Sequence, residues 1–148
     1  MKKVLILGST GSIGTSALEV IKGNVGYQTK SLVARKNKKL ILEQAKEFNV
    51  SNIFLSEGVF SENEVKSNLD INFSNNLEEL LSDKDIDIVI AAFSGLVGIK
   101  SILQSIKAGK KILIANKEPL VVAGKKLLSE AKKYGCLLYT SPSPRDRH

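Results

Sequence analysis

The feature that most constrains the fold is an apolar run that leads directly into a glycine-rich segment. Residues 4–7 are all apolar and do not alternate with polar residues, which is typical of a strand buried on both faces of a sheet. Glycines follow at positions 8, 11 and 14, and from Ser12 onward apolar residues recur at helical spacing. Residues 8–14 therefore form the turn from a strand into a helix. Such a turn lets a ligand approach the backbone, and the start of the helix favours an anion such as a phosphate.

Beyond this turn, segments typical of strands alternate with segments typical of helices. The expected strands are residues 3–7, 27–34, 52–56, 71–74, 86–93, 110–116 and a last one from 136; the expected helices are residues 12–24, 37–49, 61–69, 76–83, 98–109 and 118–135. This alternation predicts a Rossmann-like α/β fold, with a doubly wound, mostly parallel sheet and helices on both faces. Ligands of such sheets bind at the carboxyl ends of the strands.

Composition narrows the possible classes of function. A chain of 148 residues, 43% of them hydrophobic, suits one domain with a substantial core, and no stretch is long and apolar enough to span a bilayer. The first expected strand starts so close to Met1 that we expect no targeting peptide. The single cysteine, Cys136, is expected to be a small core residue, and we expect a cytoplasmic location.

The formal net charge of +7 raises nucleic-acid binding as one possibility. The lysines are spread along the chain, however, and the three Tyr and five Phe residues are not interleaved with them. Most lysines are therefore expected on solvated helix faces. We expect a small-molecule partner, with no nucleic acid and no membrane.

The segment after the second expected strand, ARKNKK, concentrates positive charge. NAD-binding folds usually place an acidic residue there to hold the ribose 2′-hydroxyl, whereas this chain has Arg35, Lys36 and Asn37, and the next acid is Glu43. Two adjacent cations and an amide suit a 2′-phosphate, which favours NADP(H). Two alternatives stay open: the lysines form a solvated helix start, and the G-x-x-G-x-x-G pattern is a tight turn without a ligand.

A third polar group follows the apolar strand that ends near residue 115. Asn116, Lys117 and Glu118 form either a helix cap with a solvated charge pair or contacts to a nicotinamide and a substrate. Lysine offers a compact cation for a phosphate or a developing oxyanion.

Taken together, GSTGSIG, ARKN, AAFSGLVGI and ILIANKEPLVVAG resemble the 1-deoxy-D-xylulose 5-phosphate reductoisomerase family over residues 1–138, with ANKE as the most specific motif. The resemblance implies an NADPH-dependent oxidoreductase that also needs a divalent metal, Mg or Mn. That enzyme converts 1-deoxy-D-xylulose 5-phosphate to 2-C-methyl-D-erythritol 4-phosphate in non-mevalonate isoprenoid biosynthesis. It also implies a homodimer for the full-length protein.

The resemblance also implies roles for individual residues. Those implied to bind the cofactor are Thr10, Gly11, Ser12 and Ile13 at the pyrophosphate, Arg35, Lys36 and Asn37 near the 2′-phosphate, and Asn116 and Glu118 near the nicotinamide. Lys117 is implied to contact the sugar phosphate. Arg35 stands where many members have glycine, and Pro119 stands where Ser, Ala or Thr is expected.

The last ten residues depart from the family pattern. The family continues with a PVDSEH segment that supplies metal ligands, whereas this chain reads YTSPSPRDRH. We expect residues 1–138 to be an NADPH-binding domain from a longer enzyme and residues 139–148 to be an unstructured, non-native tail. Asp146 and His148 are not expected to bind metal, because too few donors surround them. The metal ligands are expected beyond Leu138, so the chain alone is expected to be inactive.

Two other classes of protein remain as alternatives. One is the NADP-binding half of another reductase, such as a semialdehyde dehydrogenase, which needs a catalytic cysteine that Cys136 does not convincingly supply. The other is a stand-alone dinucleotide-sensing module.

Overall fold

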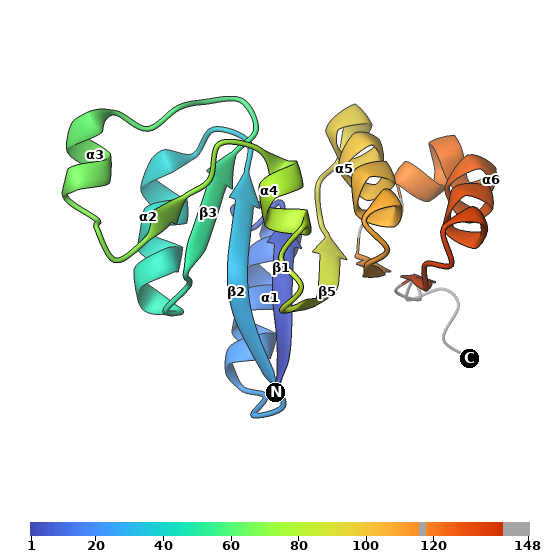
Figure 1. Ribbon diagram of the computed structural model, residues 1–148, viewed down its shortest axis with the longest axis horizontal. Coiled ribbons are helices and arrows are strands. Elements are labelled where there is room, and N and C mark those ends of the chain that lie inside the picture. Colours follow the sequence, from blue (N-terminus) through green and yellow to red (C-terminus); the bar gives the residue numbers. More distant parts are fainter. Residues whose placement is uncertain (116–117, 141–148) are drawn as a thin grey trace.

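The computed structural model describes residues 1–115 and 118–140, and in these ranges strands and helices alternate as expected (Figure 1). The elements are β1 (Lys2–Leu7), α1 (Ser12–Lys22), β2 (Tyr27–Ala34), α2 (Lys38–Glu47), β3 (Asn52–Leu55), α3 (Glu62–Lys66), β4 (Asn72–Phe73), α4 (Leu77–Leu81), β5 (Ile86–Ala91), α5 (Gly95–Lys107), β6 (Lys111–Ile114), α6 (Glu118–Lys133) and β7 (Leu138–Thr140).

The seven strands of the described ranges form one parallel sheet with the order β4-β3-β2-β1-β5-β6-β7. Strands β2, β3 and β4 follow one another on one side of β1, and strands β5, β6 and β7 follow one another on its other side. This confirms the Rossmann-like, doubly wound fold. The order reverses between β1 and β5, so the carboxyl ends of these two strands form the switch point at which such sheets bind ligands.

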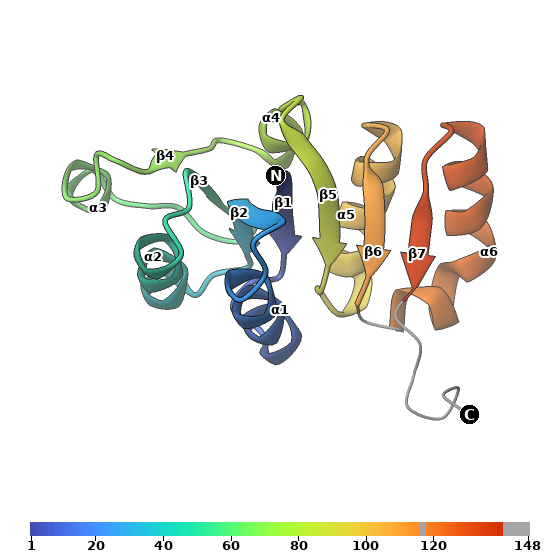
Figure 2. The same ribbon diagram turned by 90° about the horizontal axis from the view of Figure 1, so that it is seen from below.

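Helices cover both faces of the sheet, with α1 and α2 on one face and α5 and α6 on the other (Figure 2). Strand β1 lies in the middle and contributes to both cores. Leu5 packs in the core under α5 and α6, whereas Ile6 packs in the core under α1 and α2. Successive side chains of a strand point to opposite faces, so a strand covered on both sides needs apolar residues at every position. This explains the unbroken apolar run at residues 4–7.

Local sequence signals mark several of the helix ends. Ser61 and Glu64 form the expected capping box at the start of α3, where each side chain accepts a hydrogen bond from the other residue's backbone N–H. Gly109 and Gly135 follow α5 and α6 with positive φ angles of 74° and 64°. Cys136 is buried in the core, as expected, and burial raises the pKa of its thiol.

Several elements differ from the sequence-based expectation; α3, for example, spans Glu62–Lys66 instead of residues 61–69. Helix α5 starts at Gly95 instead of residue 98, and α6 has a non-helical residue at Ala123, with φ −136° and ψ 24°. The sheet extends two residues past the boundary expected at Leu138, because Tyr139 and Thr140 continue β7 and pair with β6. The expectation of an unstructured tail is therefore wrong for these two residues, and residues 141–148 lie outside the described ranges.

No helix in the described parts of the chain combines the length and the apolar character that crossing a membrane requires.

Candidate functional site

The glycine turn lies at the carboxyl edge, between the ends of β2 and β5. The N–H groups of Gly8 and Ser9 both donate to the Val33 carbonyl at the end of β2, at 2.7 and 3.1 Å. Gly8 has a φ of 90°, and a Cβ atom there would lie 2.8 Å from the backbone nitrogen of Phe93, just after β5. Only glycine satisfies both constraints, so the turn is fixed at the switch point of the sheet.

The other two glycines of the turn have different roles. A Cβ atom on Gly14 would lie 2.0 Å from the Gly8 carbonyl oxygen, so the first turn of α1 packs directly on the backbone of the turn. Gly11 has ordinary extended angles, φ −79° and ψ 173°, and among the described residues a Cβ atom there would meet only the Gly8 oxygen, at 3.8 Å. Gly14 is therefore required by packing, whereas Gly11 leaves open space above the turn.

The start of α1 offers backbone donors without a side-chain cap. Gly11 is the N-cap residue, and the first turn of this eleven-residue helix contains no acidic residue. Among the described residues, no backbone acceptor is found for the N–H groups of Ser12 and Ile13. Free N–H groups and the positive end of the helix dipole suit an anion. The sequence prediction for Thr10, Gly11, Ser12 and Ile13 thus falls on one continuous stretch of backbone facing this space.

A buried side-chain amide of α2 forms a hydrogen bond to the backbone of the glycine turn. Gln44 of α2 is only 3% exposed, and its Nε2 donates to the Ser9 carbonyl at 2.8 Å. The Thr15 hydroxyl donates to the same oxygen at 3.4 Å. Sequence reasoning missed Gln44, although a glutamine between the core positions Ile41 and Ala45 is a signal that could have found it.

The loops after β2 and β3 are joined by two backbone hydrogen bonds and one ion pair. Ser56 and Glu57 donate from their backbone N–H groups to the carbonyls of Ala34 and Arg35, each at 2.8 Å. The Arg35 Nε lies 2.6 Å from Glu57 Oε2. The hydrogen bond from Arg35 lowers the pKa of the Glu57 carboxyl and raises the pKa of the Arg35 guanidinium.

This pairing corrects part of the sequence interpretation. The sequence placed the next acid at Glu43, within α2, and left Arg35 and Lys36 as two free cations. The structure brings Glu57 to Arg35 from the loop after β3. Lys36 is exposed and has no ion-pair partner in the ranges that the structure describes. Lys36 is therefore the cation of this loop that is available to an incoming anion.

The other polar residues of the same loop have structural partners. The Asn37 Oδ1 accepts a hydrogen bond from the Leu40 N–H at 3.2 Å and caps α2. Lys38 lies 3.3 Å from the Glu64 carboxylate of α3. The cap uses the amide oxygen of Asn37, so its NH₂ group is the part that can donate to a ligand.

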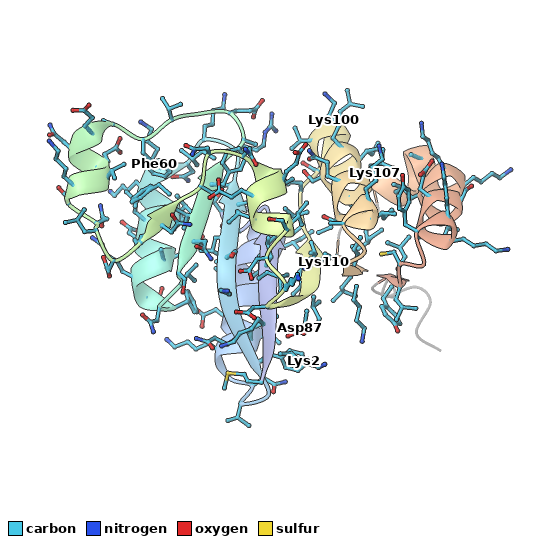
Figure 3. All side chains as sticks on the ribbon, viewed as in Figure 1. Lys2, Phe60, Asp87, Lys100, Lys107 and Lys110 are labelled. Atoms are coloured by element: carbon cyan, nitrogen blue, oxygen red, sulfur yellow. The ribbon has the colours of Figure 1, made fainter. Side chains whose placement is uncertain are left out.

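A hollow of about 430 Å³ opens beside Glu57, between the loop after β3 and helix α5. It is lined by Val33, Phe54, Ser56, Glu57, Asn76, Leu77, Val97, Lys100, Ser101 and Gln104. Figure 3 shows Lys100 at the upper end of the molecule, far from Lys2 and Asp87 near the amino terminus. The hollow therefore belongs to the same edge of the sheet as the glycine turn.

The third predicted group falls largely outside the described residues. Ala115 donates from its N–H to the Ala91 carbonyl at 2.9 Å, which continues the pairing of β6 with β5. Asn116 and Lys117 follow directly and lie outside the described ranges, as do Asp146 and His148. Glu118 is the first residue of α6. In the described ranges, no group of three or more His, Cys, Asp or Glu side chains is placed to hold a metal ion.

Comparison with known proteins decides the family. The family model of 1-deoxy-D-xylulose 5-phosphate reductoisomerase matches residues 4–124. This chain belongs to that family. The reductoisomerase of Glaesserella parasuis is 39% identical over 146 residues, and that of Agathobacter rectalis is 40% identical over 144 residues. The alignments cover 93% and 91% of this chain, which spans about 37% of the length of either relative.

Solved reductoisomerase structures share the fold. A crystal structure of DOX-P reductoisomerase in complex with NADPH, fosmidomycin and magnesium superposes with a TM-score of 0.78 at 33% identity, over 95% of this chain and 36% of the other. The reductoisomerase of Zymomonas mobilis in complex with NADPH also gives a TM-score of 0.78, at 29% identity, over 94% of this chain and 38% of the other. A biliverdin reductase from Synechocystis, at 22% identity and a TM-score of 0.69, shares the fold alone.

Proposed function

We propose that residues 1–138 form the NADPH-binding domain of a 1-deoxy-D-xylulose 5-phosphate reductoisomerase. The observation that carries this proposal is the pairing of two anion sites along one edge of the sheet. The start of α1, which has no side-chain cap, lies at the switch point between β1 and β5, and Lys36, which has no ion-pair partner among the described residues, lies at the end of the neighbouring strand β2. A dinucleotide phosphate places a pyrophosphate and a 2′-phosphate along such an edge.

The residues present fit this cofactor. The N–H groups of Ser12 and Ile13 bind the pyrophosphate, and the absence of a side chain on Gly11 leaves room for it. Lys36 binds the 2′-phosphate, with the Asn37 amide beside it. The apolar part of the hollow beside Glu57 receives the adenine. When bound, NADPH supplies the hydride for the reduction.

The rest of the reaction belongs to the longer enzyme. We infer from the family resemblance that Asn116 and Glu118 contact the nicotinamide and that Lys117 contacts the sugar phosphate, whose charge its ammonium group attracts. The metal, Mg or Mn, is held by ligands that the family supplies after the position of Leu138. The substrate is 1-deoxy-D-xylulose 5-phosphate, and the product is 2-C-methyl-D-erythritol 4-phosphate. The full-length enzyme is a cytoplasmic homodimer of the non-mevalonate isoprenoid pathway.

Calorimetric titration of the 148-residue chain with NADPH and with NADH tests the proposal. The expected result is binding of NADPH with at least tenfold higher affinity than NADH, because the charge-assisted contacts to the 2′-phosphate are absent in NADH. The same titration at raised salt should reduce the preference, because exposed charges are screened. Equal binding of the two cofactors, or no binding of either, would contradict the proposal.

A further inference from the structure

We propose that Gln44 is a positioning residue for the phosphate-binding turn. It holds the Ser9 carbonyl and thereby directs the N–H of Thr10 toward the pyrophosphate. This inference rests on the proposed function, since it assumes a dinucleotide at the turn. It adds a residue from α2, outside the glycine motif, to the machinery of the site.

Gln44 lies 35 positions from Ser9 in the sequence, yet its Nε2 donates to the Ser9 carbonyl at 2.8 Å in the buried interior. The Thr15 hydroxyl reaches the same oxygen only at 3.4 Å, beyond the usual range for a hydroxyl donor. Gln44 is therefore the stronger of the two anchors for this carbonyl.

The planar peptide bond between Ser9 and Thr10 links the direction of the Ser9 carbonyl to that of the Thr10 N–H. In a trans peptide the C=O and the following N–H point in opposite directions, and the described chain contains no cis peptide. Holding the Ser9 oxygen toward α2 therefore turns the Thr10 N–H away from α2. Among the described residues this N–H has no hydrogen-bond acceptor, and Thr10 is partly exposed. The Thr10 N–H thus joins those of Ser12 and Ile13 as a donor to the pyrophosphate.

Gln44 is a polar side chain in a buried position of α2. The Gln44 Oε1 has no hydrogen-bond partner in the described structure, and neither has the buried Oγ of Ser9. Burying an unpaired polar atom is unfavourable, so an apolar side chain of similar size would pack in α2 at lower cost. The glutamine is explained by what its NH₂ group does to the turn.

The variant Gln44→Met tests the inference, because methionine is similar in length and cannot donate to Ser9. Ile41→Val is the matched control, since Ile41 is a fully buried residue of the same helix and contacts the core instead of the turn. For each chain we would measure the NADPH dissociation constant, the thermal stability without ligand, and the carbonyl ¹³C shift of Ser9 by NMR. Gln44→Met should bind NADPH about three- to tenfold more weakly and move the Ser9 signal. Ile41→Val should lose stability but keep its affinity.

The outcomes separate this inference from the proposed function. If Gln44→Met binds NADPH like the unmutated chain, or if Ile41→Val loses as much affinity, the inference is overturned and the proposed function stands. If the unmutated chain does not bind NADPH, the proposed function fails first and the inference fails with it. If Gln44→Met folds poorly, a measurement on the unmutated chain still tests the inference. NADPH should shift the Thr10 amide proton of the unmutated chain downfield, and an unmoved signal overturns the inference.

Discussion

Glu57 Oε2 lies 2.6 Å from the Nε of Arg35, across the loops that follow two neighbouring parallel strands. The ion pair is exposed, so its own contribution to stability is small. Its effect on ligand binding is more specific. It places a negative charge beside Lys36, where the 2′-phosphate is proposed to bind, and the positive charge of Lys36 contributes to the lowered pKa of Glu57. Glu57 and the phosphate therefore compete for the same cations.

Glu57→Gln should consequently bind NADPH more tightly, by about two- to fivefold at low salt, and leave NADH binding nearly unchanged. Calorimetry with both cofactors measures the change. Glu43→Gln is the matched control, because Glu43 is an exposed acid on α2 without an ion-pair partner among the described residues. Weaker NADPH binding by Glu57→Gln would show that the carboxylate serves to orient Arg35 for the phosphate instead.

Lys36→Glu should weaken NADPH binding by roughly tenfold or more, because a charge-assisted contact to the 2′-phosphate is replaced by repulsion. NADH binding should fall much less. Lys46→Glu carries the same change of charge in the last turn of α2, at the other end of the helix, and should affect both cofactors little. A similar loss for the two variants would point to net charge, not to a phosphate site after β2.

The order of the elements was predictable because almost every boundary has a local signal. The apolar run at residues 4–7 marks the central strand, and Ser61 with Glu64 marks the start of α3. The Arg35–Glu57 pair was not predictable in the same way. It depends on β3 lying next to β2, and parallel strands that pair through a crossover leave no short-range pattern in the sequence.

The contact of Gln44 with Ser9 also could not be predicted from the sequence. The position of Gln44 on α2 was expected, but its partner is a backbone carbonyl 35 residues earlier, and backbone acceptors are identical at every residue. The strand at Tyr139 and Thr140 was missed because β7 lies at the edge of the sheet, where polar residues are tolerated and no apolar alternation is required. Sequence patterns thus identify the core and its glycines, whereas polar contacts between separate elements require the structure.

A substitution at Gly11 in the glycine turn should abolish ligand binding without preventing folding. Gly11→Val should fold with normal helix content, because the backbone angles of Gly11 suit any residue and, among the described residues, a Cβ atom there has no neighbour closer than 3.8 Å. It should nevertheless abolish dinucleotide binding by filling the space above the turn. Gly23→Val, at the other end of α1, should fold and bind normally. Circular dichroism and NADPH titration check both variants. Normal binding by Gly11→Val would mean that the turn is only structural.

Gly14→Ala, unlike Gly11→Val, should destabilise the fold itself. Its added methyl group would lie 2.0 Å from the Gly8 carbonyl oxygen, so α1 must move away from the turn. We expect a loss of stability of about 1–3 kcal/mol or more, measured by chemical denaturation, together with loss of binding. A stable Gly14→Ala chain would contradict the packing described between α1 and the turn.

The ion pair between Lys30 and Asp83 should make the stability of the fold depend on pH. Partial burial raises the pKa of Asp83, but the hydrogen bond from Lys30 at 2.6 Å and that from the Asp85 N–H outweigh it, so the pKa lies below its ordinary value. A lowered carboxyl pKa stabilises the fold above the unfolded value of about 3.9, and this stabilisation is lost as the pH falls through the folded pKa. Lys30→Met should therefore cost about 1 kcal/mol at pH 7 and progressively less below about pH 4.

Denaturant titrations at several pH values test this dependence. Lys22→Met is the control, because Lys22 lies 3.8 Å from Glu47 and both side chains are more than half exposed. Its cost should be small and nearly independent of pH, because the ion pair is exposed and the contact of the Lys22 ammonium group with the Phe48 ring, 5.4 Å from the centroid, does not depend on a carboxyl titration. A penalty for Lys30→Met that stays constant down to low pH would assign the effect to packing of the lysine chain.

The last prediction concerns activity. Catalysis in this family uses a divalent metal to hold and polarise the oxygens of the substrate, and such a metal needs several oxygen ligands in defined geometry. The chain spans about 37% of the length of its relatives, and the family's metal-binding segment follows the position of Leu138, where this chain reads YTSPSPRDRH. We therefore expect no NADPH oxidation by the 148-residue chain with 1-deoxy-D-xylulose 5-phosphate and Mg²⁺ or Mn²⁺. Nicotinamide absorbance follows the reaction, with a full-length relative as the positive control and NADPH binding verified in the same sample. Metal-dependent turnover would show that Asp146 or His148 supplies ligands after all, and that the last residues are part of a working site.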